Sequence, residues 1–383
     1  MPENLSPELL AIRVQTQQFV DEILKPMEAS LGEDAESPIP EEVRSRVREE
    51  SRQSGLFYKT QPAEFGGQPA GVLELTMLRE LFAAANLRLS QFVFGPGPGA
   101  LGRAQGDLKS NYLDAVLRGE KRGAFGFTEP DSAKRPTWAR REGDHLVVTG
   151  QKSFVTGGDT ADFISVLINV EADEAGSRGG TAMVVIDRES EGVEIERRFS
   201  SLDGSGHASI GFNKVRVPIA NIIGKIGEGM PRALGNIGNV RLSVAAQASG
   251  MCMWVIDFVS EHLLAPHRSG TPLGAREGVR LRYADMRIET YAARSMLYRT
   301  ARLAESDENV VNETIATKVF CTETAGRVVD TAVQLVGGQA LVHGHPLERL
   351  YRQVRSMRLM EGASDLLRIS LVKGRLELNK GRV

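Results

Sequence analysis

The residues best suited to chemistry stand in two segments of one stretch, residues 123–158. The first segment, GAFGFTEP, is an apolar run that ends on Thr128 and Glu129. The second, GQKSFVTGG, alternates apolar and hydroxyl side chains between Gly150 and Gly158. Alternating side chains beside glycines favour extended backbone that lies close against a flat ligand. The stretch therefore predicts a wall for a planar ligand.

A second candidate for chemistry is Glu361, in RLMEGASDLLR just before a predicted helix. It follows the apolar pair Leu359 and Met360 and precedes the flexible Gly362. Apolar surroundings make a carboxylate hard to ionise and raise its pKa from about 4.3 toward neutrality. Such a group can remove a weakly acidic carbon-bound proton near pH 7. The alternative is a glutamate that interacts with free N–H groups at a helix start.

These motifs together resemble the acyl-CoA dehydrogenase family, which are flavoenzymes built around FAD. The resemblance rests on F-x-F-T-E-P, G-x-K-x-F-V-T-G-G and E-G-A-S, and it extends through QPAEFGG and KVRVP. It implies that Glu361 removes the α-proton of an acyl thioester while the β-hydride moves to flavin N5. It also implies that the backbone N–H of the base and the ribityl hydroxyl of FAD polarise the thioester carbonyl.

The resemblance implies where the flavin ring would lie. Thr128 and Thr156 match family residues whose hydroxyl and backbone groups contact the isoalloxazine. Phe154 would screen the flavin, and Phe125 and Phe127 would line the same wall. For any single phenylalanine, an aromatic barrel core is the alternative.

The adenosine half of FAD is expected at TAVQLVGGQALV. Gln334, Gly337 and Gly338 match the family's Q-x-x-G-G, which generally acts across a subunit interface. Glycine leaves room for the dinucleotide to touch backbone. Paired glycines after an amphipathic helix are also an ordinary helix C-cap.

Several positions depart from the family pattern and predict a divergent member with an altered FAD grip or substrate. Ser132, in DSAKRP, would replace the serine that contacts the FAD pyrophosphate. In PHRSGTPL, the FAD-binding Arg268 is shifted in register and Ser269 stands where the family has phenylalanine. Ala363, expected beside the cofactor, replaces a frequent threonine. His207, in GSGHASIGF, would line the substrate entrance or be an ordinary polar loop residue.

Two further residues are expected to bind substrate: Gly362, beside the base, and Arg241, in GNVRLSVAAQ. An arginine on an otherwise apolar helix face is costly to bury unless it is paired. The CoA phosphates or a nearby carboxylate would pair Arg241. An ion pair within its own helix is the alternative.

The order of patterns along the chain predicts an α+β fold. Helical periodicity occurs in residues 7–30, 40–55, 71–86 and 107–118, and returns in long helices after residue 228, including 275–304, 309–336 and 364–378. Between them, short β-branched runs are separated by turns. We therefore expect an N-terminal all-α domain (1–122), a small antiparallel β-barrel or sandwich (123–227) and a C-terminal four-helix bundle (228–383). The pattern lacks the βαβ alternation of a Rossmann fold.

Composition narrows the class of protein. The 383 residues carry a net charge of −2, which gives no electrostatic case for nucleic acid or an anionic membrane. Cys252 and Cys321, the only cysteines, are expected to be buried thiols rather than a disulfide or metal site. The N-terminus lacks a secretory signal and no apolar run approaches 18 residues, so a cytoplasmic protein is expected.

The resemblance implies partners as well as chemistry. It implies an acyl-CoA substrate, a homotetramer or dimer of dimers, and an electron-transferring flavoprotein as oxidant. One alternative is an oxidase, or an enzyme with a carrier-bound or non-thioester substrate, on the same fold. Another is a non-catalytic partner subunit, against which the presence of Glu361 argues.

Overall fold

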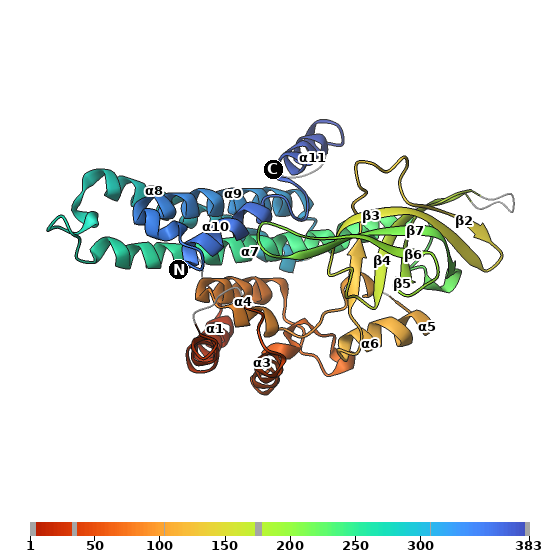
Figure 1. Cartoon of the computed structure of the whole chain (residues 1–383), viewed down its shortest axis with the longest axis horizontal. Coiled ribbons are helices and arrows are strands. Elements are labelled where there is room, and N and C mark those ends of the chain that lie inside the picture. The colour runs from red at the N-terminus through yellow and green to blue at the C-terminus, as the bar shows by residue number, and fades with distance from the viewer. Residues whose placement is uncertain (1–4, 33–36, 103, 173–177, 307, 380–383) are drawn as a thin grey trace. The chain divides into compact units, whose positions relative to one another are not determined.

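The computed structural model describes residues 5–32, 37–102, 104–172, 178–306 and 308–379 (Figure 1). Its contacts divide the chain into two compact units. The helical unit comprises Met1–Lys59, Gln68–Gly95 and Gly238–Val383, and the sheet unit comprises Thr60–Gly67 and Pro96–Ile237. Helices from the two ends of the sequence therefore share one unit and one hydrophobic core.

The helical unit follows the predicted helices closely in its described parts. Ser6 caps the first helix by accepting a hydrogen bond from the Leu9 N–H, and Pro7 opens that helix, where its missing N–H costs nothing. The longer helices are α1 (Pro7–Phe19, continued by a π-turn at Val20–Leu24 into α2, Lys25–Ala29), α3 (Glu41–Gln53), α4 (Val72–Ala85), α7 (Gly229–Leu264, which begins in the sheet unit), α8 (Glu277–Glu305), α9 (Val311–Val336), α10 (Pro346–Met357) and α11 (Ser364–Leu376).

Helix α10 lies outside the predicted helices, so the C-terminal region has five helices (α7–α11) among the described residues rather than the four expected. Its sequence carries the missing signal. Buried apolar side chains recur at helical spacing: Leu347, Leu350, Val354 and Met357. His345 caps the helix through its ring, and Pro346 opens it. Figure 1 shows α8, α9 and α10 lying alongside one another.

A buried carboxylate, Glu80 on α4, ties three helices of this unit together. It accepts hydrogen bonds from Arg294 Nε and Nη2, both at 2.9 Å, and from the Tyr298 hydroxyl at 2.7 Å, all from α8. Ser249 on α7 donates a fourth hydrogen bond, at 2.6 Å. Helices α4 and α7 approach closely because Gly250 has no side chain: a Cβ there would lie 2.2 Å from the Glu80 carbonyl oxygen.

The sheet unit is built on one seven-stranded sheet. The strand order is β1-β4-β2-β3-β7-β6, and β5 pairs with β4. The strands are β1 (Gly123–Gly126), β2 (Trp138–Glu142), β3 (His145–Thr156), β4 (Phe163–Val170), β5 (Gly180–Asp187), β6 (Val193–Ser200) and β7 (Gly206–Pro218).

The expectation of a purely antiparallel sheet is wrong at one edge, where β1 and β2 both run parallel to β4. Strand β1 pairs with Phe163–Val166, and the start of β2 pairs with Asn169 and Val170. The chain leaves this edge after β1 and returns to it in the same direction at β2. The segment 127–137, which holds the T-E-P motif, therefore projects from the sheet between two anchored strands.

Short helices before the sheet cover one of its faces. α5 (Gly106–Leu108) and α6 (Asp114–Leu117) are joined by a π-turn at Lys109–Leu113. The Tyr112 ring packs edge-on against Phe163 of β4, with 5.0 Å between centroids, and its hydroxyl donates to Asp187 at 2.9 Å. Burial first, and then this carboxylate, raise the pKa of Tyr112 to about 12.

Helix α7 is long and apolar enough, by length and composition alone, to cross a membrane. The mean hydropathy of its 18-residue window is 1.4, although no unbroken apolar run of that length occurs. Of that window, 61% is buried inside the protein. A core helix has the same properties, so the hydropathy of α7 is weak support for a membrane span.

The Glu80 network generates a stability prediction. Arg294→Met removes the only guanidinium that pairs with Glu80 among the described residues and leaves a buried carboxylate with two hydroxyl donors. We expect the free energy of unfolding, measured by urea denaturation, to fall by about 3–5 kcal/mol. The matched control is Arg327→Gln, because Arg327 pairs with Glu289 at 2.8 Å while about half exposed. That variant should lose less than about 1 kcal/mol. Equal losses in the two variants would contradict the prediction.

Candidate functional site

The two motifs of residues 123–158 lie side by side in the sheet unit, as the sequence predicts. The Ser153 N–H donates to the Thr128 carbonyl at 2.8 Å. The Lys152 ammonium donates to the Phe127 carbonyl at 3.2 Å. Backbone from the end of β1 and backbone from β3 therefore form one continuous surface.

A buried ion pair fixes this surface from behind. Lys152 is 1% exposed and pairs with Glu129, which also accepts hydrogen bonds from the Thr137 N–H at 3.1 Å and hydroxyl at 3.0 Å. Burial lowers the pKa of Lys152, and Glu129 opposes that shift. Gly150 lets the strands approach, since a Cβ there would lie 2.5 Å from Thr137 Cα. Sequence reasoning gave this pair no role, although a lysine in an alternating strand was an available signal.

The front of the surface presents exposed side chains from both motifs. Thr128 and Thr156 are exposed, and the Phe154 side chain is 60% exposed. Phe154 has φ +54°, a left-handed conformation that costs a non-glycine residue about 1–3 kcal/mol. Phe125 and Phe127 stack at 6.1 Å and are partly buried. An exposed aromatic ring on strained backbone favours a ligand-binding role over the barrel-core alternative for Phe154.

His207 lies on β7 beside this surface and is part of a chain of polar contacts. Its Nδ1 lies 3.2 Å from the Thr156 hydroxyl, and its Nε2 lies 3.0 Å from the Ser205 hydroxyl. Ser205 in turn donates to Asp203 at 2.6 Å. The His207 ring also contacts the Phe154 ring, at 5.9 Å between centroids. His207 is therefore an oriented strand residue rather than an ordinary loop residue.

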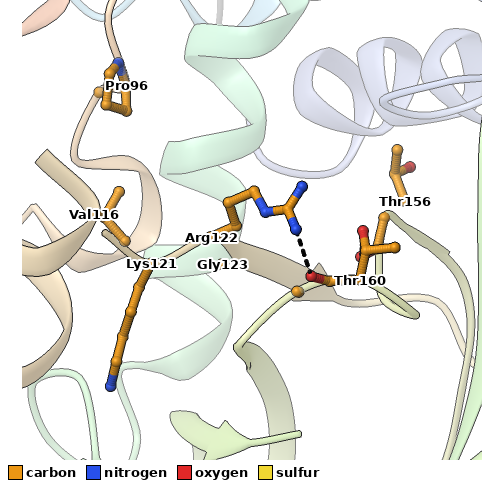
Figure 2. Close-up of a pocket in the computed structure, with 10 residues that line it drawn as sticks. Pro96, Val116, Lys121, Arg122, Gly123, Thr156 and Thr160 are labelled. Carbon is orange, nitrogen blue, oxygen red and sulfur yellow. Dashed lines mark hydrogen bonds between the residues drawn. The ribbon is translucent and has the colours of Figure 1, made fainter. Parts of the chain in front are cut away.

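A pocket of about 390 Å³ adjoins the same surface within the sheet unit and shares Thr156 with it. Figure 2 shows the Arg122 side chain extending toward Thr160, whose carbonyl accepts a hydrogen bond from Arg122 Nη2 at 3.2 Å. Lys121 points away from Arg122 in this view. Two cationic residues, Lys121 and Arg122, thus line the pocket together with glycines and threonines.

In the helical unit, Glu361 occupies a sharp backbone turn between α10 and α11. Glu361 has φ +54° and Gly362 has φ +101°. The Glu361 carbonyl accepts from Arg241 Nε at 2.9 Å, and the Gly362 carbonyl accepts from the Lys318 ammonium at 2.9 Å. Burial raises the pKa of Glu361, while Arg241 and then Lys318 oppose this rise. A carboxyl group with a raised pKa is what the sequence predicted here.

The contacts of two other residues bear on this reading of Glu361. The expected partners of Arg241 were phosphates, a carboxylate side chain or a residue of its own helix, but its guanidinium donates to the backbone carbonyl of Glu361. The reason is the turn before α11, which presents a carbonyl to the partly buried guanidinium. Asp365, the next acidic residue along the chain, is solvated: its side chain is 91% exposed and is paired with Arg368.

The glycines expected at the adenosine half of FAD lie at the end of α9. Gly337, with φ +84°, caps the helix by donating to the Val333 carbonyl at 2.8 Å. The C-cap interpretation is therefore correct for Gly337. Gly338 is exposed, and a Cβ added there would meet no atom within 4 Å. Packing within the chain does not require glycine at 338, and the exposed Gln334 lies one turn earlier.

Three departures from the family pattern, at Ser132, in PHRSGTPL and at Ala363, lie in segments with few side-chain hydrogen bonds. Ser132 and Arg268 are exposed, and no described residue forms a hydrogen bond with either side chain. Ser269 contacts His267 Nδ1 at 2.7 Å through its hydroxyl. Ala363 is the N-cap of α11 and supplies no side-chain cap. Neither Ser132 nor Arg268 is thus tied by its side chain to another predicted site residue among those that the structure describes.

Comparisons with known proteins place these features in a family. Residues 124–215 match the acyl-CoA dehydrogenase middle domain, and residues 227–376 match the acyl-CoA dehydrogenase C-terminal domain. The short-chain specific acyl-CoA dehydrogenase of Clostridium acetobutylicum is 27% identical over 386 residues, covering 98% of this chain and 100% of that protein. An acyl-CoA dehydrogenase of Bacillus subtilis is 29% identical over 331 residues, covering 83% of this chain and 86% of the relative.

A solved structure agrees over nearly the whole chain. A probable acyl-CoA dehydrogenase from Mycobacterium abscessus has a TM-score of 0.82 at 27% identity, covering 96% of this chain and 98% of that one. The family is one of FAD-dependent oxidoreductases. The turn at Glu361 and the paired motifs of the sheet unit both lie within the matched regions. The chain belongs to the acyl-CoA dehydrogenase family and has its fold.

Proposed function

We propose that this protein binds FAD and catalyses α,β-dehydrogenation of an acyl-CoA thioester, with Glu361 as the base. The observation that carries the proposal is the partly buried Glu361 carboxyl on a strained turn whose two carbonyls accept hydrogen bonds from cations. Strain of this kind persists only where surrounding contacts impose it, and it is concentrated at functional sites. Asp365, which is solvated and paired with Arg368, is poorly suited to the role.

The proton chemistry falls to Glu361. Its ionised carboxylate takes the α-proton of the thioester and becomes the neutral acid, while the electrons of the broken C–H bond form the new C–C double bond. Burial makes the carboxylate a stronger base than one in water, because the charged form is poorly solvated. FAD, when bound, would supply the acceptor for the β-hydride. The fixed backbone of the turn orients the carboxyl group for this transfer.

The residues of each unit fit the part of FAD assigned to them. The sheet unit offers an open surface with an exposed aromatic ring at Phe154 and exposed hydroxyls at Thr128 and Thr156, which suit a planar ring with polar edges. The helical unit offers Gly338, where a side chain is absent without any internal packing reason. Ser132 and Arg268, both exposed, remain available for the pyrophosphate.

An electron-transferring flavoprotein partner and a homo-oligomer belong to the same proposal. One relative, 25% identical, is the caffeyl-CoA reductase-Etf complex subunit CarC of Acetobacterium woodii, which supports a flavoprotein partner. Helix α11 carries an exposed apolar face that supports assembly into a dimer or tetramer. This face is formed by Leu366, Ile369, Val372 and Leu376.

The reverse reaction is a second candidate. Relatives at 27% identity include a 3-(aryl)acrylate reductase of Clostridium sporogenes and an acryloyl-CoA reductase (NADH) of Anaerotignum propionicum. The same geometry serves both directions, since Glu361 would return the proton to the α-carbon during reduction. The first relative also supports the alternative of a substrate that is not a CoA thioester.

The central prediction concerns Glu361→Gln, which keeps the size of the side chain and removes the base. Turnover of a panel containing glutaryl-CoA, cyclohexane-1-carbonyl-CoA and short-chain acyl-CoA thioesters, with an artificial electron acceptor, should fall by at least about 10²–10⁴-fold. Flavin absorbance of the purified variant should be unchanged, because Glu361 is proposed to face substrate. In the unmodified enzyme, the rate should rise with pH through a pKa above the ordinary value of about 4.3.

The same panel separates the candidate functions. Oxidation of thioesters supports the dehydrogenase, whereas reduction of 2,3-unsaturated acids or thioesters alone, with a reduced dye, supports the reductase. Rapid peroxide formation in air without a mediator would identify an oxidase. A variant Glu361→Gln that reduces its flavin at the unmodified rate would remove Glu361 from the mechanism, and a purified protein without flavin absorbance would contradict the FAD assignment.

Gly338→Val tests the position of the adenosine half of FAD. We expect flavin occupancy, measured by the ratio of flavin to protein absorbance after purification, to fall at least about tenfold, because a branched side chain would fill the open surface. Gly278→Val is the control, since Gly278 is also exposed with open space around it, at the start of α8. Full occupancy in both variants would show that the cofactor does not approach Gly338.

A further inference from the structure

Lys318, on α9, is the one buried cation of the Glu361 turn to which sequence and family resemblance gave no role. Its side chain is 0% exposed, and its ammonium lies 2.9 Å from the Gly362 carbonyl oxygen. Arg241, on α7, holds the preceding carbonyl at the same distance. Two cationic side chains, from two helices, thus donate hydrogen bonds to two consecutive carbonyls of one turn.

The stability of the helix core does not account for this lysine. Taking an ammonium group out of water is costly unless a carboxylate compensates it. No described carboxylate lies within ion-pair distance of Lys318, in contrast to Lys152, which pairs with Glu129. An apolar side chain of similar length would fill the same volume without the cost of burying charge. The lysine therefore has a use that is not packing.

The turn that Lys318 holds is strained and needs external support. Glu361 is a non-glycine residue in the left-handed region, at φ +54°. A Cβ added to Gly362 would lie 3.0 Å from Leu367 Cδ2. Ala363, which follows, gives α11 no side-chain cap. Ser364 closes the base of the turn by donating to the Arg358 carbonyl through its N–H at 3.0 Å and its hydroxyl at 3.3 Å. The two carbonyls at the strained apex, those of Glu361 and Gly362, accept hydrogen bonds from Arg241 and Lys318.

We propose that Lys318 is a positioning residue for the reaction: its ammonium anchors the Gly362 carbonyl and, with Arg241, holds the Glu361 turn in the conformation that presents the carboxylate to substrate. This inference rests on the proposed role of Glu361. Lys318 acts through the backbone and does not touch the reacting atoms.

The charges around Lys318 add a consequence for pH. It is faced by Arg241 from α7, Glu361 from the turn, and Glu323 from its own helix. Glu323 is already paired with Arg358 at 2.8 Å and lies 3.7 Å from Arg368 of α11. Burial first, and then Arg241, lower the pKa of Lys318 to about 8. Above that pH the turn loses a charged donor and Glu361 loses a nearby positive charge.

The experiment compares Lys318→Met and Lys318→Arg with the unmodified holoenzyme, using the thioester of the panel that the unmodified enzyme oxidises fastest. In Lys318→Met, kcat should fall about 10–10²-fold at pH 7 with little change in KM, because a small displacement of a catalytic group has effects of this size. The acidic limb of its kcat profile should move to higher pH, since one cation no longer opposes the raised pKa of Glu361.

The alkaline side of the profile distinguishes positioning from general destabilisation. The unmodified enzyme should lose activity above pH about 8, and this limb should be absent in Lys318→Arg, whose guanidinium stays charged. Thr322→Val is the control for repacking, because this buried hydroxyl, on the same helix, bonds only within α9 among the described residues. It should keep the unmodified pH profile. An unchanged acidic limb and kcat in Lys318→Met would overturn the proposal.

Two measurements do not depend on turnover and so separate this inference from the proposed function. A crystal structure of Lys318→Met should show Glu361 released from the left-handed region, and a retained turn would overturn the proposal. The second measurement is stability against pH. Because the folded pKa of Lys318 is below its unfolded value of about 10.4, the unmodified protein should gain stability relative to Lys318→Met as pH rises from about 8 to about 10.4. A constant difference would also count against the proposal.

Discussion

The burial of charged side chains is the constraint on which the packing of both units depends. In the helical unit, Glu80 joins α4, α7 and α8 through four hydrogen bonds, two of them from one guanidinium. In the sheet unit, Lys152 and Glu129 join the two motifs of the ligand wall. A buried charged group is stable only in arrangements that give it hydrogen-bond or ion-pair partners, because the loss of a partner leaves the free-energy cost of desolvation uncompensated. These contacts therefore specify how segments far apart in sequence must meet.

The Glu361 turn also places charged groups out of water, but there the cations do not pair with the carboxylate. Its carboxyl group is partly buried without a direct ion pair among the described contacts, and its neighbours Arg241 and Lys318 bind backbone rather than the carboxylate. The cations are close enough to limit the rise in its pKa but do not cancel it. The turn is held rigidly while the side chain keeps its basicity. A direct salt bridge to Glu361 would have favoured the ionised form and weakened the base.

Local patterns predicted the parts of this molecule that local physics decides. The helices at 7–29, 72–85 and 311–336 follow apolar periodicity. The raised pKa of Glu361 is also found, but it comes from burial in the fold, because the apolar neighbours from which it was predicted, Leu359 and Met360, are themselves exposed. Contacts between distant residues were not accessible in the same way. Nothing near Arg241 in sequence indicates that its partner is a carbonyl 120 residues away. The parallel edge of the sheet likewise depends on where the chain returns to β4 after residue 137. Helix α10 is a different case, because its apolar residues do recur at helical spacing and the sequence analysis missed them.

The loop of residues 127–137, which joins β1 to β2, indicates how a ligand-binding surface of this kind can change. Both of its ends are registered against one strand, β4, so the length of the loop between them is not transmitted to the rest of the sheet. Insertions or deletions among its exposed residues, such as those around Ser132, alter what the loop offers a ligand and leave the strand pairing intact. The inner part, tied by Glu129 and Thr137, lacks that freedom. One segment thus combines a fixed frame with a tip whose length and side chains can change, so that ligand contacts can be altered without altering the strand pairing of the sheet.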